Sequence, residues 1–146
     1  MARRIMLNGT SYFGQGAIQE IVNEIKNRHF KKVLVTSTPD LFEFKVATKV
    51  TDLLDAAGIA YDVYDNIKPN PTIENVTSGV AACKAAGADV IVAVGGGSAI
   101  DTSKAIATIM TNPEFSDVRS LEGLAPTKHP CLPIIAVSTT SGTAAE

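Results

Sequence analysis

Short apolar segments alternate with amphipathic segments along most of this 146-residue chain. Residues 33–35, 89–94 and 132–137 are dominated by Val, Ile, Leu and Ala, a composition typical of strands buried on both faces of a parallel sheet. A further run, over residues 60–64, is interrupted by Asp62, so we expect it nearer to the sheet edge. Apolar residues at helical spacing predict helices over residues 17–27, 41–57, 73–86 and 99–110.

The alternation of strands and helices predicts an α/β fold with a mostly parallel, Rossmann-like sheet and helices on both faces. The chain has the length of one ordinary domain, and a short additional strand is expected over residues 5–7. Residues 112–128 are polar and predict a loop with one turn of helix near residues 119–121. Thr143 and Glu146 have the spacing of a capping box, which signals the start of another helix. We therefore expect residues 1–146 to be the N-terminal domain of a longer protein.

Composition narrows the class of function. Apolar residues make up 45% of the chain, the formal net charge is -2, and there is no Trp, so we expect neither nucleic acid nor a membrane as a partner. No apolar run approaches the roughly 18 residues of a membrane helix, and the short run after the basic start is not a signal peptide. Cys83 and Cys131 are isolated in the sequence, which is typical of thiols in a reducing compartment. We expect a cytoplasmic protein.

A glycine-rich turn follows the apolar run that ends at Val94. Gly95, Gly96 and Gly97 can bring the backbone close to a ligand, and Ser98 and Asp101 have the spacing of a capping box at the start of a helix. The N–H groups of such a helix start favour an anion, so we expect a phosphate or pyrophosphate here, although a tight turn alone would have the same residues. Ile100 stands where the common dinucleotide fingerprint has its third glycine, so the motif is not that fingerprint.

Three loops rich in small polar residues follow predicted strands, over residues 36–40, 95–98 and 138–143. Ligands of open α/β sheets bind outside the carboxyl ends of the strands, so we expect these loops to converge on one cleft. Asn70, between two prolines, also follows a strand. Asp101 could contact a ligand or cap its helix, and capping is the more common role of an acidic residue at that place. His29 and His129 lie far apart in polar loops and do not suggest a metal site.

Three motifs together resemble the iron-containing (group III) alcohol dehydrogenases. They are Gly95-Gly96-Gly97-Ser98-x-x-Asp101-x-x-Lys104, Pro69-Asn70-Pro71-Thr72, and Thr139-Thr140-Ser141-Gly142-Thr143-Ala144-Ala145-Glu146. The stretch over residues 112–124 and the opening Met6-Leu7-Asn8 are most similar to the lactaldehyde reductase (propanediol oxidoreductase) branch.

The resemblance implies a two-domain enzyme that interconverts a small alcohol or 1,2-diol and its aldehyde. It implies that this chain is the cofactor-binding half, and that an absent all-helical C-terminal domain supplies the catalytic residues and the Asp and three His ligands of Fe(2+). No metal ligand or catalytic residue is therefore assigned within this chain, and the chain alone should be inactive. The resemblance also implies a homodimer formed through residues 4–8. The positions that we expect to bind the cofactor are Thr38, Asn70, Gly95, Gly96, Gly97, Ser98, Asp101, Thr139, Thr140 and Thr143.

The identity of the dinucleotide depends on one position. Relatives that prefer NAD often carry an acidic residue where this chain has Thr38. We expect NAD as the cofactor, with NADP possible.

A second interpretation stays open at this point. Residues 138–143 are similar to the hydroxyl-rich phosphate loops of phosphosugar isomerase domains, which bind sugar phosphates without redox chemistry. That interpretation leaves the triple glycine and the Pro-Asn-Pro segment without a role.

Overall fold

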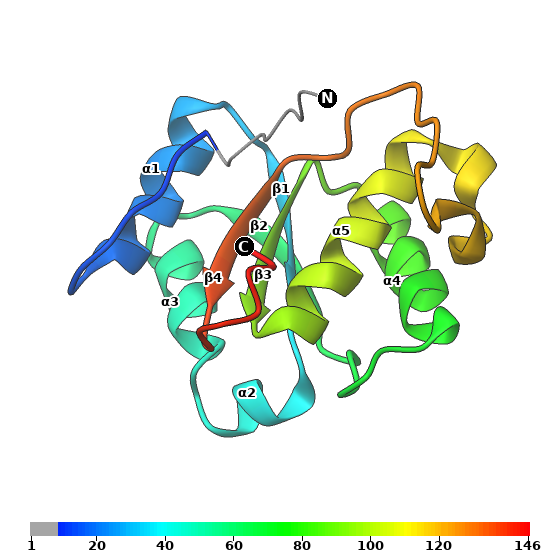
Figure 1. Cartoon of the computed structure of the whole chain (residues 1–146). Helices are drawn as coiled ribbons and strands as arrows, with labels where there is room; N and C mark the ends of the chain where they lie inside the picture. Colours follow the sequence, from blue (N-terminus) through cyan, green and yellow to red (C-terminus); the bar gives the residue numbers. More distant parts are fainter. Residues whose placement is uncertain (1–8) are drawn as a thin grey trace, which may run out of the picture.

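A computed structural model describes residues 9–146, and its centre is a parallel sheet of four strands (Figure 1). The strand order is β2-β1-β3-β4, so β1 and β3 are central. Both central strands are almost completely buried, whereas β2 and β4 are largely exposed or half-buried. The strands are β1 (Lys32–Thr36), β2 (Ala60–Tyr64), β3 (Val90–Gly95) and β4 (Ile134–Ser138).

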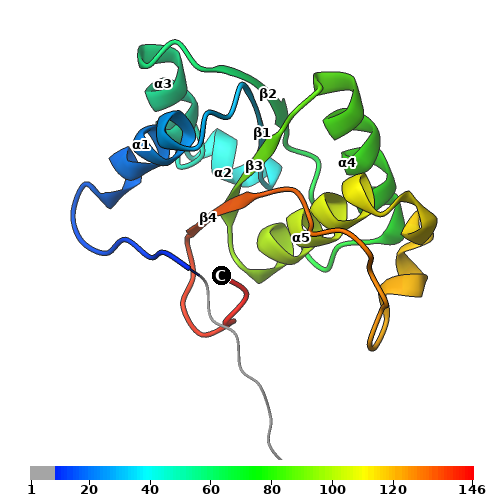
Figure 2. The same cartoon turned by 90° about the horizontal axis from the view of Figure 1, so that it is seen from above.

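Helices cover both faces of this sheet, as the sequence predicted (Figure 2). One face carries α1 (Glu20–Asn27) and α3 (Thr48–Ala56), and the other carries α4 (Ile73–Ala86) and α5 (Gly97–Thr111). The short helix α2 (Pro39–Glu43) follows β1. Three 3-10 turns complete the described elements: η1 (Ala17–Gln19), η2 (Pro113–Phe115) and η3 (Val118–Leu121). Within residues 9–146, no helix has the length and apolar character needed to cross a bilayer.

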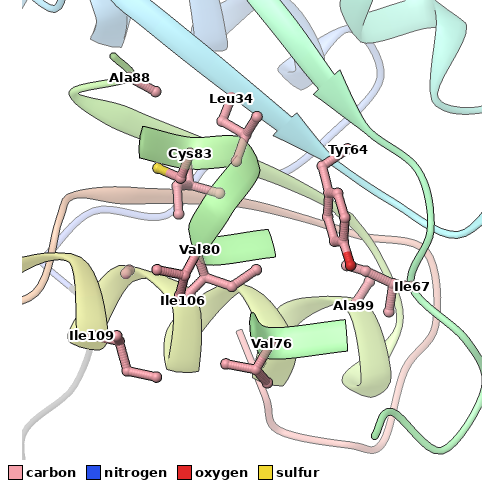
Figure 3. Packing of buried hydrophobic residues seen from close by; sticks show 12 residues of the cluster. Leu34, Tyr64, Ile67, Val76, Val80, Cys83, Ala88, Ala99, Ile106 and Ile109 are labelled. Carbon is pink, nitrogen blue, oxygen red and sulfur yellow. The ribbon is translucent and has the colours of Figure 1, made fainter. Parts of the chain in front are cut away.

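Alternation of side chains along the central strands divides the core into two layers. Val33 and Val35 of β1 pack on the side of α1 and α3, and Leu34 between them packs on the side of α4 and α5. The same alternation holds in β3, because successive strand residues point to opposite faces. Figure 3 shows the second layer, where residues of α4 and α5 meet beneath Leu34 and Tyr64.

The helix predicted over residues 41–57 is wrong as a single helix. The chain forms α2 and α3 instead, with a break at residues 44–47 where Lys45 takes a left-handed conformation (φ 56°). The N–H groups of Val46 and Ala47 both donate to the Leu41 carbonyl, at 2.8 and 2.9 Å, which closes the end of α2. Apolar spacing continues across this break, so the periodicity of the sequence did not reveal it.

The start of α5 also differs from the prediction. Ser98 and Asp101 do not form a capping box, because the helix begins at Gly97 and Gly96 is its N-cap residue. The predicted start of α4 is confirmed: Thr72 is its N-cap residue and forms a capping box with Asn75. The strand expected over residues 5–7 and the dimer contact expected over residues 4–8 both lie outside the described residues.

Candidate functional site

The sheet has a topological switch point between its two central strands. The chain leaves β1 toward α2 and α3 on one face, and leaves β3 toward α5 on the other face. The loops at the carboxyl ends of β1 and β3 therefore diverge to opposite faces, which is the arrangement in which open α/β sheets form a ligand-binding crevice. Ligands of open α/β sheets bind in such a crevice, so the connectivity alone identifies this end of the sheet (lower part of Figure 1) as the candidate site.

The glycine-rich turn lies at the end of β3 and leads directly into α5. Gly95 has φ +150°, a conformation that side chains rarely adopt, and a Cβ atom there would lie 2.6 Å from the Cβ atom of Ala99. Gly96 is extended, and no side chain forms a capping hydrogen bond at this end of α5. The first N–H groups of a helix lack partners within the helix and carry partial positive charge. This end of α5 is therefore suited to an anionic group.

The threonine-rich loop after β4 packs directly on the glycine-rich turn. The Thr139 N–H donates to the Gly95 carbonyl at 3.0 Å. A Cβ atom on Gly96 would lie 2.7 Å from Thr140 Oγ1, and one on Gly97 would lie 3.2 Å from Thr143 Cγ2. The predicted convergence of these two loops is confirmed. The glycines also have a role that the sequence did not suggest, because they let the threonine side chains approach the turn.

The other predicted positions lie around this pair of loops. Thr38 is the half-buried N-cap residue of α2, just beyond the end of β1. Asn70 is exposed in the loop after β2 and has φ 54°. Asp101 is exposed on the second turn of α5 and does not cap the helix. Thr38 and Asn70 thus share one edge of the sheet with the two loops, whereas Asp101 lies farther along its helix.

Two buried hydroxyl residues that the sequence reasoning missed support the crevice. Ser37 donates from Oγ to the Val94 carbonyl at 2.8 Å, which joins the ends of β1 and β3. Thr36 Oγ1 lies 2.7 Å from Ser103 Oγ, which itself donates to the Ala99 carbonyl at 2.7 Å. These bonds fix α5 against β1. The signal in the sequence is the pair of hydroxyl residues directly after an apolar run, a pattern that equally fits the start of a loop.

Two side chains of α4 have shifted pKa values. A hydrogen bond from Thr72 lowers the pKa of the Glu74 carboxyl, in the first turn of α4. Burial raises the pKa of the Cys83 thiol to about 11, in the core between α4 and the sheet. Across residues 9–146, no three His, Cys, Asp or Glu side chains come together in a way that could hold a metal ion.

Comparison with known proteins gives consistent matches. The family described as "Iron-containing alcohol dehydrogenase" matches residues 8–146. Lactaldehyde reductase from Escherichia coli (strain K12) is 51% identical over 146 residues, covering 100% of this chain and 38% of that protein. The structure of the alcohol dehydrogenase from Oenococcus oeni is similar to this one with a TM-score of 0.90 and 34% sequence identity. The match covers 99% of this chain and 38% of the Oenococcus oeni chain.

A third similar protein, NADH-dependent butanol dehydrogenase A from Thermotoga maritima, has a TM-score of 0.81 and 31% identity. The match covers 98% of this chain and 36% of that one. The chain thus spans between 36% and 38% of the length of these three proteins.

Proposed function

The chain belongs to the iron-containing alcohol dehydrogenase family, and from this premise we propose that its crevice binds a nicotinamide dinucleotide. The observation that carries the proposal is the direct packing of Thr140 and Thr143 on Gly96 and Gly97, beside the uncapped end of α5. Helix N–H groups and hydroxyl groups together form a neutral, hydrogen-bonding seat for a pyrophosphate. The cofactor would supply hydride transfer to or from the substrate carbon.

All of the predicted positions except Asp101 have a defined part in this proposal. The backbone of the glycine-rich turn and Ser98 would contact the pyrophosphate, and the threonines of the closing loop would contact the diphosphate and the adenosine part. Asn70 would contact the cofactor from the side of β2. Thr38 would lie next to the ribose of the adenosine part, at the position that distinguishes NAD from NADP. These assignments follow the family resemblance at Thr38, Asn70, Gly95, Gly96, Gly97, Ser98, Asp101, Thr139, Thr140 and Thr143.

We propose NAD rather than NADP as the first cofactor. One structural relative is described as NADH-dependent. No acidic side chain stands at Thr38 to repel a 2′-phosphate, so NADP should also be accepted to some degree.

The proposed reaction is the interconversion of a small alcohol or 1,2-diol and its aldehyde. It rests on the similarity to lactaldehyde reductase, a relative of which this chain covers 38%. The metal and the catalytic residues would belong to a part of the enzyme that corresponds to the remaining length of the relatives. Residues 1–146 alone should then bind the cofactor without turning over substrate, and we propose a homodimer for the whole enzyme.

NADH titration followed by NMR of the 15N-labelled chain tests the cofactor site, because this method detects binding at millimolar affinity. We expect NADH to shift the amide signals of residues 95–98 and 139–143. Thr140→Val removes one hydroxyl and should weaken binding by roughly 10- to 150-fold, since a hydrogen bond to a charged group contributes ~1.5–3 kcal/mol. Thr127→Val, at an exposed site before β4, is the matched control and should bind like the wild type.

Two competitors distinguish the alternatives. NADPH should bind more weakly than NADH, and a strong preference for NADPH would contradict the choice of NAD. A sugar phosphate that displaces NADH from the same residues with higher affinity would favour the isomerase-like interpretation instead.

A further inference from the structure

One buried amide holds both ends of the loop that carries Asn70. Asn75, in the first turn of α4, is 3% exposed. Its Nδ2 donates to the Asn66 carbonyl at 2.7 Å, and its Oδ1 accepts from the Thr72 N–H at 3.3 Å. The Lys68 N–H also points to this Oδ1, at 3.5 Å. A single side chain thus contacts the backbone at the beginning, the middle and the end of the loop.

The clamped loop is packed against the helix that starts at the glycine-rich turn. Ile67 is fully buried and belongs to the same core cluster as Tyr64 and Ala99 of the first turn of α5 (Figure 3). The Tyr64 hydroxyl lies 2.8 Å from the Asn75 carbonyl. The loop is therefore fixed from two sides, by the Asn75 amide and by the core beneath the candidate site.

Asn70 needs such support because its own conformation is uncommon. With φ 54° it lies in the left-handed region, which residues other than glycine occupy only where the surroundings favour it. It is exposed and stands between two prolines, so the conformation depends on how the loop ends are held. A buried and fully hydrogen-bonded amide specifies one arrangement of the backbone more strictly than apolar packing does.

We propose that Asn75 is a positioning residue of the dinucleotide site, acting through the Asn70 loop. This inference rests on the proposed function, because it assumes that Asn70 contacts the cofactor. Asn75 itself touches only protein. Its effect on binding is to present Asn70 next to the amino end of α5 in one fixed conformation, before the ligand arrives.

A second buried asparagine provides a matched control. Asn112 is 0% exposed and clamps another loop in the same manner, accepting from the N–H groups of Lys128 and His129 at 3.0 and 2.9 Å. It lies at the carboxyl end of α5, whereas the candidate site lies at the amino end. Asn75→Ala and Asn112→Ala therefore remove comparable networks, one beside the site and one away from it.

The experiment compares NADH binding by the wild-type chain and the two variants, with thermal unfolding measured in parallel. We expect both variants to lose stability, but only Asn75→Ala to weaken NADH binding, by about tenfold, as is typical when a supporting residue of a binding site is removed. Asn112→Ala should bind within about twofold of the wild type. Asn75→Asp keeps the size and an acceptor oxygen and removes the Nδ2 donor to the Asn66 carbonyl. It should also weaken binding, and it covers the case in which Asn75→Ala does not fold.

The outcomes separate this inference from the proposed function. One result is that the wild-type chain binds NADH and folded Asn75→Ala binds it with the same dissociation constant. That result, or the same result in Asn75→Asp if Asn75→Ala does not fold, would overturn the role of Asn75 and leave the proposed dinucleotide site unaffected. Equal weakening by Asn75→Ala and Asn112→Ala would also overturn it, because the effect would follow stability alone. Absence of NADH binding by the wild-type chain would overturn the proposed function, and this inference with it.

Discussion

Alanine at Gly95 should destabilise the protein far more than alanine at the neighbouring Gly96. At Gly95 the backbone has φ +150°, and the new Cβ atom would lie 2.6 Å from the Cβ atom of Ala99, which is fixed to a buried helix backbone. Backbone strain of this kind costs ~1–3 kcal/mol, and overpacking in a core costs another ~1–3 kcal/mol. The expected loss is therefore about 2–6 kcal/mol.

At Gly96 the backbone is extended, and the close atoms are the side-chain ends of exposed Thr140: a Cβ atom would lie 2.7 Å from its Oγ1 and 3.3 Å from its Cγ2. The side chain of an exposed loop residue can shift away, so we expect a loss below ~1 kcal/mol, well under the cost of core overpacking. Adding Thr140→Ala should remove even this cost, because the Thr140 Cβ atom lies 3.6 Å away, at ordinary contact distance.

Differential scanning calorimetry measures the difference. For a chain of this length 1 kcal/mol corresponds to ~2–4 °C in Tm, so Gly95→Ala should lower Tm by roughly 5–20 °C and Gly96→Ala by no more than about 4 °C. A Tm for Gly95→Ala within about 2 °C of the wild type would refute the reasoning. So would a Gly96→Ala loss that Thr140→Ala does not relieve.

Two further predictions concern titratable groups. In the folded chain a thiol reagent at pH 8 should modify exposed Cys131 and not Cys83, because the Cys83 thiol is buried and has a pKa of about 11. Mass spectrometry measures the modification, and modification of both cysteines in the folded chain would contradict this prediction. Thr72→Ala should raise the pKa of Glu74, measured by 13C NMR of its carboxyl, because the Thr72 hydrogen bond that lowers this pKa is lost. Because the pKa of Glu74 is lower in the folded chain, its carboxylate stabilises the wild-type fold at pH values above its ordinary pKa. This contribution disappears as the pH falls through the lowered pKa. If the free energy of unfolding of Thr72→Ala had the same dependence on acidic pH as that of the wild type, the linkage would be contradicted.

The central strands and most helix ends could be predicted because local signals and tertiary structure agree there. The run before Gly95 is apolar on both faces, and β3 is buried on both faces. Gly58 and Gly87 follow α3 and α4 with φ 66° and 62°, as expected of glycines just past a helix end. The edge position of β2 followed from Asp62, which is exposed and forms an ion pair with Lys32 at 3.2 Å.

The errors occurred where contacts distant in sequence decide the local structure. Lys45 takes a left-handed conformation without any glycine or proline to mark the break between α2 and α3. The Ser98–Asp101 pair has a capping pattern, yet α5 starts at Gly97, in a turn whose neighbours are Thr140 and Thr143 from the far end of the chain. Ser37 and Ser103 gain their roles only when β1, β3 and α5 come together.

The position of β4 has a consequence for motion at the site. Among residues 9–146 this strand pairs with β3 alone, and all five of its residues are half-buried or exposed, whereas β3 is buried throughout. Elements with few buried contacts open locally at a small fraction of the free energy needed to unfold the core. The loop over residues 139–143 follows the partly exposed strand β4, whereas the glycine-rich turn follows the fully buried strand β3. The wall that carries residues 139–143 should therefore open at a lower cost in free energy than the wall formed by the glycine-rich turn.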